Sequence, residues 1–463
     1  MQKGAIVMVI YASDKQFWGQ SDSQTIQNAI DHAEKTGLGR VVIPRHNDRT
    51  GENIWIIEKT ILLPSDMTVV LEDAHLRLAD GVFENIFRNR NCRTDLGNTM
   101  EGEQKNIRIL GSGNATLDGG NHNGLVEQMI RDNPGKYPPL SINLLIFLHN
   151  VRDFTVSGLN IVDSRWWSIC CVYCRWGRIT DMDFKMYGTQ ENQDGIDLRV
   201  GCEYITIENI TGITGDDTIA MTALPLDDFV PESKLKVEGK KPYIHDITIR
   251  NVISSTHGCS IIRFLCEDGA QLYNILVDGI LDTGETYSGA PFFFGVSGTH
   301  FVKDRAHVMG EVRNITIRNV FTHAHNAIML CESVQNMLIE NVTCQGSANN
   351  IGIRLVKNFA CKDLTIRNVN LQGDDMDSVF YSAADPKNLE GLTIENVHVA
   401  KAKHLFRREK LPVTNLVCEE LTETEFCPDD VKFPSAYSRY HLCSFGKVIE
   451  NRPKENRFTG ESK

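Results

Sequence analysis

The stretch NITIRNV, residues 314–320, decides the fold, because close copies of it recur along the chain. Its Ile and Val residues alternate with Thr and Arg, which is the two-residue period of a strand with one buried face. The copies are YITIENI (204–210), DITIRNV (246–252), NILVDGI (274–280), NITIRNV (314–320), NMLIENV (336–342), DLTIRNV (363–369) and GLTIENV (391–397). Where no insertion intervenes, they begin 22 to 28 residues apart, a period typical of a stacked solenoid.

No segment with a helical period separates the copies, so leucine-rich and βαβ architectures fit the sequence poorly. A coil of short strands alone predicts an all-β fold, a right-handed parallel β-helix. The Asn near the end of most copies, such as Asn319 and Asn341, is expected to stack on its counterparts in neighbouring turns of the coil. Asn suits this place because it tolerates the left-handed backbone geometry of a turn.

An open solenoid end must be covered, and the stretch SDSQTIQNAIDHAEKTG (21–37) has the signals of a capping helix. Ser21 and Gln24 form a capping-box pattern, and Gly37 marks the stop. We expect this helix to close the N-terminal end of the coil, within a cap covering about residues 1–45.

The repeats predict a single β-helix domain over residues 1–433, followed by a polar C-terminal tail over residues 434–463. Insertions in a solenoid grow as loops on one rim, commonly around the binding face. The segments that break the period here are 121–143, 223–243 and 284–312.

Composition limits the partners. The chain has 463 residues and is 41% hydrophobic, enough to bury a large core. Its formal net charge of -12 and its lack of a Lys/Arg cluster argue against binding to nucleic acid or to an anionic membrane surface. We therefore expect a small-molecule, sugar or protein partner.

The short apolar stretch AIVMVIYA (5–12) is far too short to span a bilayer and is followed by no small-residue cleavage site. We interpret it as a first strand and predict a cytoplasmic protein, with a leaderless form of a secreted enzyme as the alternative. Cys171 and Cys174 form a single C-x-x-C, which without a second pair or nearby histidines indicates core packing.

Consecutive repeats carry acidic residues in the stretches NQDGIDLRV (192–200) and TGDDTIAMT (214–222), and a histidine in STHGCSIIRF (255–264). Stacked rungs of a coil lie about 4.8 Å apart. The register of the repeats then brings together four titratable side chains, Asp194, Asp216, Asp217 and His257.

Carboxylates this close repel one another, so at least one is expected to keep its proton near neutral pH. One protonated acid and one ionised base in the same cleft are what acid/base catalysis needs. The alternative is structural, since Asp-Asp and Asp-Gly are ordinary turn residues at the corner of a coil.

In this order and one coil apart, NQDGID, GDD and HG resemble the NTD, GDD and GHG motifs of family-28 glycoside hydrolases, the polygalacturonase and rhamnogalacturonase group. The stretch DSQTIQNAIDHAEKTGLGRVVIP is similar to that family's N-terminal helix and first strand, and DSRWWSICCVYC to its Ser-Pro-x-Trp rung. The resemblance implies an inverting hydrolase of pectin-type or related polysaccharides or oligosaccharides. It also implies that no metal or other cofactor is needed.

By the same resemblance, Asp216 is the general acid that protonates the leaving oxygen. Asp194 and Asp217 hold and activate the water, and His257 supports the charge state of the acid. Inversion needs room for that water, so the acid and base carboxyls are expected about 6.5–9.5 Å apart.

The sequence departs from the family where an Arg-x-Lys strand grips the uronic-acid carboxylate. The corresponding rung reads SGAPFFFGV, with Pro291 and Phe293 at the places of the cations. A guanidinium is the natural bidentate partner of a sugar acid, so specificity for polygalacturonan is in doubt.

Two arginines partly fill this gap. Arg199 and Arg263 are expected in one column of the stacked rungs, with Thr222 between them, where one or both contact the substrate. The alternative is an exposed strand-face charge or an ion pair with Asp197 or Glu267.

Aromatic residues offer a further substrate contact. Phe293, at the centre of Phe292–Phe294, could stack on a sugar, although aromatic runs in a β-helix also serve as core. Of Trp166 and Trp167, one is expected to point into the coil and the other outward.

Two rival functions share these features. In a calcium-dependent polysaccharide lyase the three aspartates would bind Ca²⁺ and Arg263 would act as base. In a non-catalytic carbohydrate-binding β-helix the same surface would only hold a glycan, but a passive surface has no reason to bear the electrostatic cost of clustered carboxylates.

Overall fold

The computed structural model describes residues 9–430, apart from residues 134, 188–191, 226–234, 258, 268, 285–289, 295–307, 347–349 and 375. The predicted tail over 434–463 lies outside the described residues. Of the predicted first strand, the described part contains β1 (Ile10–Tyr11). No helix among the described residues is both long and apolar enough to cross a membrane.

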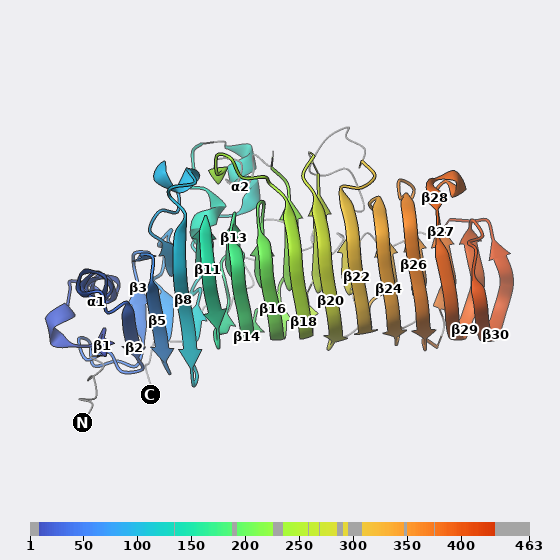
Figure 1. Cartoon of the computed structure of the whole chain (residues 1–463). Helices are drawn as coiled ribbons and strands as arrows, with labels where there is room; N and C mark the ends of the chain where they lie inside the picture. The colour runs from blue at the N-terminus through green and yellow to red at the C-terminus, as the bar shows by residue number, and fades with distance from the viewer. Residues whose placement is uncertain are drawn as a thin grey trace, which may run out of the picture.

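The described chain winds into one continuous coil of parallel strands, in which each strand pairs with the strands one turn before and one turn after it (Figure 1). Every pairing between the described strands is parallel, for example Ile205 with Ile247 and Ile247 with Ile275. The predicted parallel β-helix is therefore present along the whole coil.

Strands of the coil form three faces. The first face contains β1, β2 (Arg40–Pro44), β5 (Met67–Glu72), β8 (Gln104–Ser112), β11 (Val151–Ser157), β14 (Arg175–Lys185), β16 (Glu203–Thr214), β18 (Ile244–Thr256), β20 (Leu272–Asp282), β22 (Val312–Thr322), β24 (Val334–Cys344), β26 (Cys361–Leu371), β28 (Leu389–Glu390), β29 (Thr393–Arg408) and β30 (Thr414–Cys427). The second face begins with β3 (Trp55–Ile57), β6 (His75–Leu78), β9 (Thr116–Asp118) and β12 (Asn160–Val162), and continues in the second halves of the long strands from β14 onward.

The third face carries the candidate site. It contains β4 (Ile61–Leu63), β7 (Phe87–Asn89), β10 (Ile146–His149), β13 (Ile169–Val172), β15 (Ile196–Leu198), β17 (Ile219–Ala223), β19 (Ile262–Cys266), β21 (Phe292–Phe294), β23 (Asn326–Leu330), β25 (Ile351–Leu355) and β27 (Met376–Ser382), and ends on the last part of β29.

Asparagines bend the long strands from the first face to the second. Asn319 and Asn341 have φ of 61° and 58°, in the left-handed region that Asn tolerates. The Asn341 Nδ2 donates to Asn319 Oδ1 at 3.1 Å, and the Asn368 Nδ2 donates to Asn341 Oδ1 at 3.0 Å. The predicted stacking of these asparagines is confirmed.

Helix α1 (Asp22–Thr36) covers the N-terminal end of the coil (Figure 1). Ser21 caps it by accepting a hydrogen bond from the Gln24 N–H, and Gly37 ends it with φ of 70°. Its Ile26 and Ile30 side chains are fully buried, so the helix closes the core as predicted. Short helical segments elsewhere are η1 (Lys15–Phe17), η2 (Leu96–Asn98), α2 (Glu127–Asp132), η3 (Leu140–Asn143) and η5 (Pro386–Asn388).

Stacked aliphatic and aromatic side chains fill the coil. The rings of Phe264 and Phe294 stack with centroids 4.2 Å apart, and Phe292 is fully buried. Phe292 and Phe294 therefore belong to the core. Cys171 and Cys174 are also fully buried free thiols, which confirms the core-packing interpretation of their C-x-x-C.

Candidate active site

The acidic residues sit at the corner where the long strands end and the short strands of the third face begin. Strands β15, β17 and β19 align Ile196, Ile219 and Ile262. The register continues into the corner, where the Gly195 N–H donates to the Asp217 carbonyl at 3.0 Å. Asp194 and Asp217 therefore lie on adjacent rungs, as the repeats predicted.

Hydroxyl groups fix the backbone at this corner. The Asp216 carbonyl accepts hydrogen bonds from Thr214 Oγ1 at 2.7 Å and from Thr256 Oγ1 at 2.6 Å. Thr214 ends β16 and Thr256 ends β18, so the ends of two neighbouring strands both hold the residue that carries the candidate acid.

Asp217 is held as a carboxylate by partners on the next rung. Its Oδ1 accepts from the Ser260 N–H at 3.0 Å and from Ser260 Oγ at 2.6 Å, and its Oδ2 lies 3.3 Å from Arg263 Nε. A charge-assisted contact and two hydrogen bonds offset the cost of burying this charge.

Burial changes the charge of the other two carboxyls. Asp194 and Asp216 are only 4% and 6% exposed. Loss of solvent, then repulsion from Asp217, raises the pKa of Asp216 to about 8, although Arg263 acts in the opposite direction. Loss of solvent and repulsion from Asp216 raise the pKa of Asp194 well above its usual range. The corner therefore combines the stabilised Asp217 carboxylate with the Asp216 carboxyl, which keeps its proton near neutral pH, and with Asp194, whose pKa is also raised.

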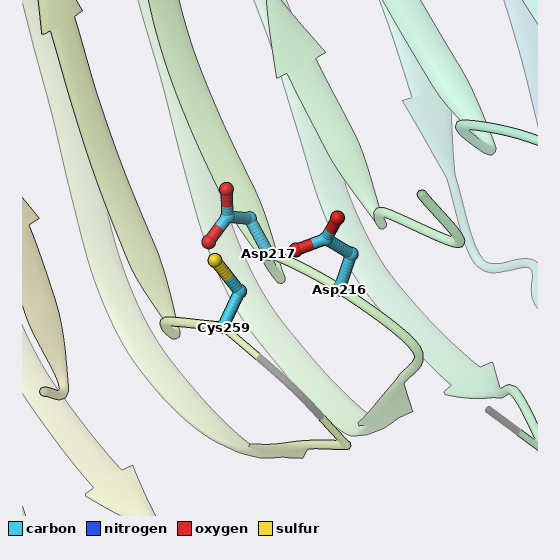
Figure 2. Close-up of side chains that lie close together, drawn as sticks. All are labelled: Asp216, Asp217 and Cys259. Carbon is cyan, nitrogen blue, oxygen red and sulfur yellow. The ribbon is translucent and has the colours of Figure 1, made fainter. Parts of the chain in front are cut away.

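Cys259 joins this group, and sequence reasoning missed it. Figure 2 shows its side chain beside Asp216 and Asp217, and one side-chain ligand atom from each of the three lies within 4.8 Å of the others. Its thiol is hydrogen-bonded to Asp216, and Arg263 Nη2 donates to its Sγ. Cys259 precedes Ser260, the rung neighbour of Asp217, and is therefore the rung neighbour of Asp216, but the sequence carries no signal for this register at the corner.

These three side chains are close enough to share a divalent cation. The guanidinium of Arg263 already contacts the Asp217 carboxylate and the Cys259 sulfur, so a metal ion would compete with it for both. The cation that this arrangement fits is the guanidinium.

His257 is not part of the group formed by these side chains, contrary to the sequence expectation. Its N–H pairs with the Thr214 carbonyl at 3.0 Å, two residues before Asp216. Its side chain is exposed, with Nε2 placed 3.2 Å from the Met186 carbonyl oxygen. The rung neighbour of Asp216 is Cys259 because the corner between the repeats contains additional residues.

The predicted common column of Arg199 and Arg263 is wrong. Arg263 pairs with Ala220, which pairs with Asp197, whereas Arg199 lies two residues further along its rung. Arg263 contacts Asp217, and the buried Arg199 guanidinium lies over the Trp167 ring, 4.7 Å from its centroid.

The aromatic candidates for substrate contact are Phe293, Trp166 and Trp167. Phe293 pairs with Arg263 through its backbone in β21, and its side chain lies outside the described part of the molecule. Trp166 and Trp167 are both buried in a cluster separate from the core of the coil, so the expectation that one of them points into the coil is wrong. They pack with Leu125 and Leu140, which belong to the inserted segment over residues 121–143.

Fold and site together define a parallel β-helix protein with a buried carboxyl cluster on one face. Residues 81–225 match the model described as "Glycosyl hydrolases family 28", which confirms the resemblance over a range that contains Asp194, Asp216 and Asp217. The matched range ends before His257 and Arg263. No curated protein sequence matches the chain.

Solved structures with the same fold have low sequence identity. The A-module of mannuronan C-5 epimerase AlgE6 from Azotobacter vinelandii has a TM-score of 0.57 at 13% identity, covering 88% of this chain and 99% of that chain. The surface protein and adhesin PfbA from Streptococcus pneumoniae has a TM-score of 0.50 at 12% identity, covering 91% and 99%. An exopolygalacturonase from Thermotoga maritima has a TM-score of 0.46 at 14% identity, covering 89% and 91%. The predicted right-handed parallel β-helix is confirmed.

Proposed function

We propose that the protein is an inverting glycoside hydrolase of pectin-type or related polysaccharides or oligosaccharides, with Asp216 as the general acid. The observation that carries this proposal is the buried Asp216 carboxyl, with a pKa of about 8, beside the Asp217 carboxylate that Arg263 holds. The family match over residues 81–225 supports the hydrolase class.

The acid step follows from the burial of Asp216. At neutral pH this carboxyl keeps its proton and can donate it to the glycosidic oxygen as the bond breaks. In the same turnover Asp217 takes a proton from water, so Asp216 ends ionised and Asp217 ends protonated. Loss of the Asp217 proton to solvent restores the repulsion that favours protonation of Asp216, and both groups are then reset.

The water step uses the neighbouring rungs. Asp217 is the carboxylate of the group and acts as the base that takes a proton from water. Asp194, one rung earlier in the same register, holds that water through a hydrogen bond. A buried Asp194 oxygen, Oδ1, has no hydrogen-bond partner within the described residues and suits this role.

Stereochemistry needs its own test. A water between acid and base requires carboxyls about 6.5–9.5 Å apart, whereas nucleophilic attack by the second carboxylate uses about 5–5.5 Å. The nearest ligand atoms of Asp216 and Asp217 lie within 4.8 Å of each other. NMR can follow which anomer of the sugar product is released first. Release of the inverted anomer means that a water attacks the sugar, held either between Asp216 and Asp217 or beside Asp194. Release of the retained anomer means that Asp217 attacks the sugar directly.

The same proposal assigns substrate contacts to Arg199, Arg263 and Phe293 on the third face. Arg263 and Arg199 are held by Asp217 and by the Trp167 ring. Arg263 therefore presents fixed positive charge beside the cluster, and Arg199 presents it over the Trp167 ring, which favours a substrate carrying carboxylates or hydroxyl-rich edges.

The first experiment measures reducing-sugar release from acidic and neutral polysaccharides and their oligomers, with and without EDTA, while ultraviolet absorbance follows unsaturated products. Hydrolysis without new absorbance and without an effect of EDTA supports the proposal. New absorbance means β-elimination, and binding without product means a non-catalytic glycan-binding protein.

Asp216→Asn tests the acid directly. It is expected to keep the fold and abolish turnover. A matched control is Asp363→Asn, the same change at an exposed left-handed turn where the preceding rungs carry Asn336 and Asn314. The control is expected to retain full activity, and an active, folded Asp216→Asn protein would contradict the assignment.

A further inference from the structure

We infer that Cys259 is a positioning residue for the candidate acid, because its thiol links the guanidinium of Arg263 to the carboxyl of Asp216. This inference rests on the proposed function, in which Asp216 is the proton donor.

The contacts form an unbroken chain from one carboxyl to the other. Arg263 Nε lies 3.3 Å from Asp217 Oδ2, Arg263 Nη2 donates to Cys259 Sγ, and the Cys259 thiol donates to Asp216. Figure 2 shows the sulfur next to a carboxylate oxygen of Asp217, with the Asp216 carboxyl directed toward them. Each contact is short-range and directional, so a change at Cys259 is felt at Asp216 and Arg263 together.

The backbone of the same corner ties these residues a second time. Thr256 Oγ1 donates to the Asp216 carbonyl at 2.6 Å and accepts from the Cys259 N–H at 3.5 Å. The acid and the thiol are thus fixed to one hydroxyl as well as to each other, which limits the orientations that the Asp216 carboxyl can adopt.

Burial keeps the sulfur in the form that can donate. Loss of solvent, aided by repulsion from Asp217 and Asp216, raises the pKa of the Cys259 thiol well above its usual range despite Arg263. A thiol is a weak donor, and Arg263 polarises it by donating to the sulfur. A neutral S–H therefore faces Asp216 throughout the pH range of the proposed reaction.

The direction of the effect follows from this hydrogen bond. A donor to the ionised carboxylate stabilises it, so Cys259 lowers the pKa of Asp216 below the value that burial and Asp217 alone would impose. Among the described residues, the other charged or titratable groups facing this cluster are Asp194, Asp217 and Arg263, and Asp197 acts on it through Asp194. None of these is changed when Cys259 is replaced.

The first test is the pH dependence of kcat for Cys259→Ala and Cys259→Ser. Loss of one hydrogen bond is expected to move the alkaline limb, where Asp216 loses its proton, upward by about half to one pH unit in Cys259→Ala. The maximal kcat is expected to fall with little change in KM, and Cys259→Ser, which keeps a donor, is expected to restore most of the rate and the position of the limb. An unmoved limb in Cys259→Ala overturns the inference, because a purely structural role would change the rate alone.

A second test does not depend on turnover. At pH 9, above the pKa of about 8 for Asp216, the wild-type carboxylate opposes ionisation of the Cys259 thiol. Asp216→Asn removes that charge, so iodoacetamide is expected to alkylate Cys259 at least about threefold faster, as half a pKa unit implies. Mass spectrometry of the Cys259 peptide measures the rate, with Asp363→Asn as the control and Cys259→Ser as the blank.

The two tests separate the two possible failures. Equal alkylation rates in wild type and Asp216→Asn, including no reaction in either, overturn the link between Cys259 and Asp216. A protein that shows the expected rate difference but releases no sugar keeps this link and loses the proposed function instead.

Discussion

Replacing Asp216 with Asn is expected to stabilise the protein at neutral pH while abolishing the proposed activity. The pKa of Asp216 is raised from its model-peptide value of 3.8 to about 8 in the folded chain. The folded state therefore holds a proton that the unfolded chain releases, and this contribution to stability is fully present below pH 3.8 and lost as the pH rises through about 8.

The size of the effect follows from the two pKa values. Between pH 3.8 and pH 7, a range of about 3 pH units, the free energy of unfolding of the wild-type protein falls by about 1.36 kcal/mol for each pH unit. The total loss is about 4 kcal/mol. Asn cannot titrate, so Asp216→Asn avoids this loss. The free energy of unfolding of Asp216→Asn minus that of wild type is therefore expected to be about 4 kcal/mol larger at pH 7 than at acid pH.

Urea unfolding followed by circular dichroism at several pH values between 4 and 8 measures this difference. Wild type and the control Asp363→Asn are expected to lose stability in parallel as the pH rises, and Asp216→Asn to lose less. A difference between Asp216→Asn and wild type that stays constant over this pH range would refute a raised pKa for Asp216, whatever the activity of the variant.

Three further substitutions test other parts of the structure. Arg263→Met removes the partner of the Asp217 carboxylate, and because Arg263 also lowers the pKa of Asp216, it is expected to reduce kcat and shift the alkaline limb of the pH profile upward. Asn341→Ala removes hydrogen bonds on both sides of the asparagine stack and places Ala at φ of 58°, so denaturant unfolding is expected to show a loss of about 1–3 kcal/mol with kcat unchanged. Gly279→Asn places an Asn in this stack between Asn251 and Asn319, but Gly279 has φ of 92°, beyond the 52° and 61° of those neighbours, so the strained substitution is expected to lower the unfolding midpoint, which a gain of stability would contradict.

The repeats predicted the fold and three of the site residues for the same reason. A fixed period sets the register of successive turns, so residues at equal places in the repeat must be neighbours on adjacent rungs. This logic predicts from the sequence that Asp194 lies beside Asp217, and the pairing of Ile196 with Ile219 agrees with it.

The repeat pattern predicted the wrong neighbours where alternation of side chains along a strand does not fix the register. The predicted column of Arg199 and Arg263 was displaced by two residues, and a displacement of two keeps every side chain on the same face of a strand. Alternation alone therefore could not detect it. His257 and Cys259 lie in a corner, where side-chain direction does not alternate, so the sequence could not decide which of them faces Asp216.

The position of the cluster at a corner also explains how the coil tolerates it. On the strands of the third face, alternate residues such as Ile196 and Ile219 point into the core, and a carboxyl there would have no partner. At the corner, the backbone turns and exposes N–H groups and hydroxyls. The Ser260 N–H and hydroxyl bind the Asp217 carboxylate, and the Thr214 and Thr256 hydroxyls bind the Asp216 backbone carbonyl. Because each turn of a solenoid contacts only its neighbours, the cost of the buried carboxyls is confined to the rungs around the site. The rest of the stacked core then supplies the stability that offsets this local cost and lets the corner keep a buried, protonated Asp216 carboxyl.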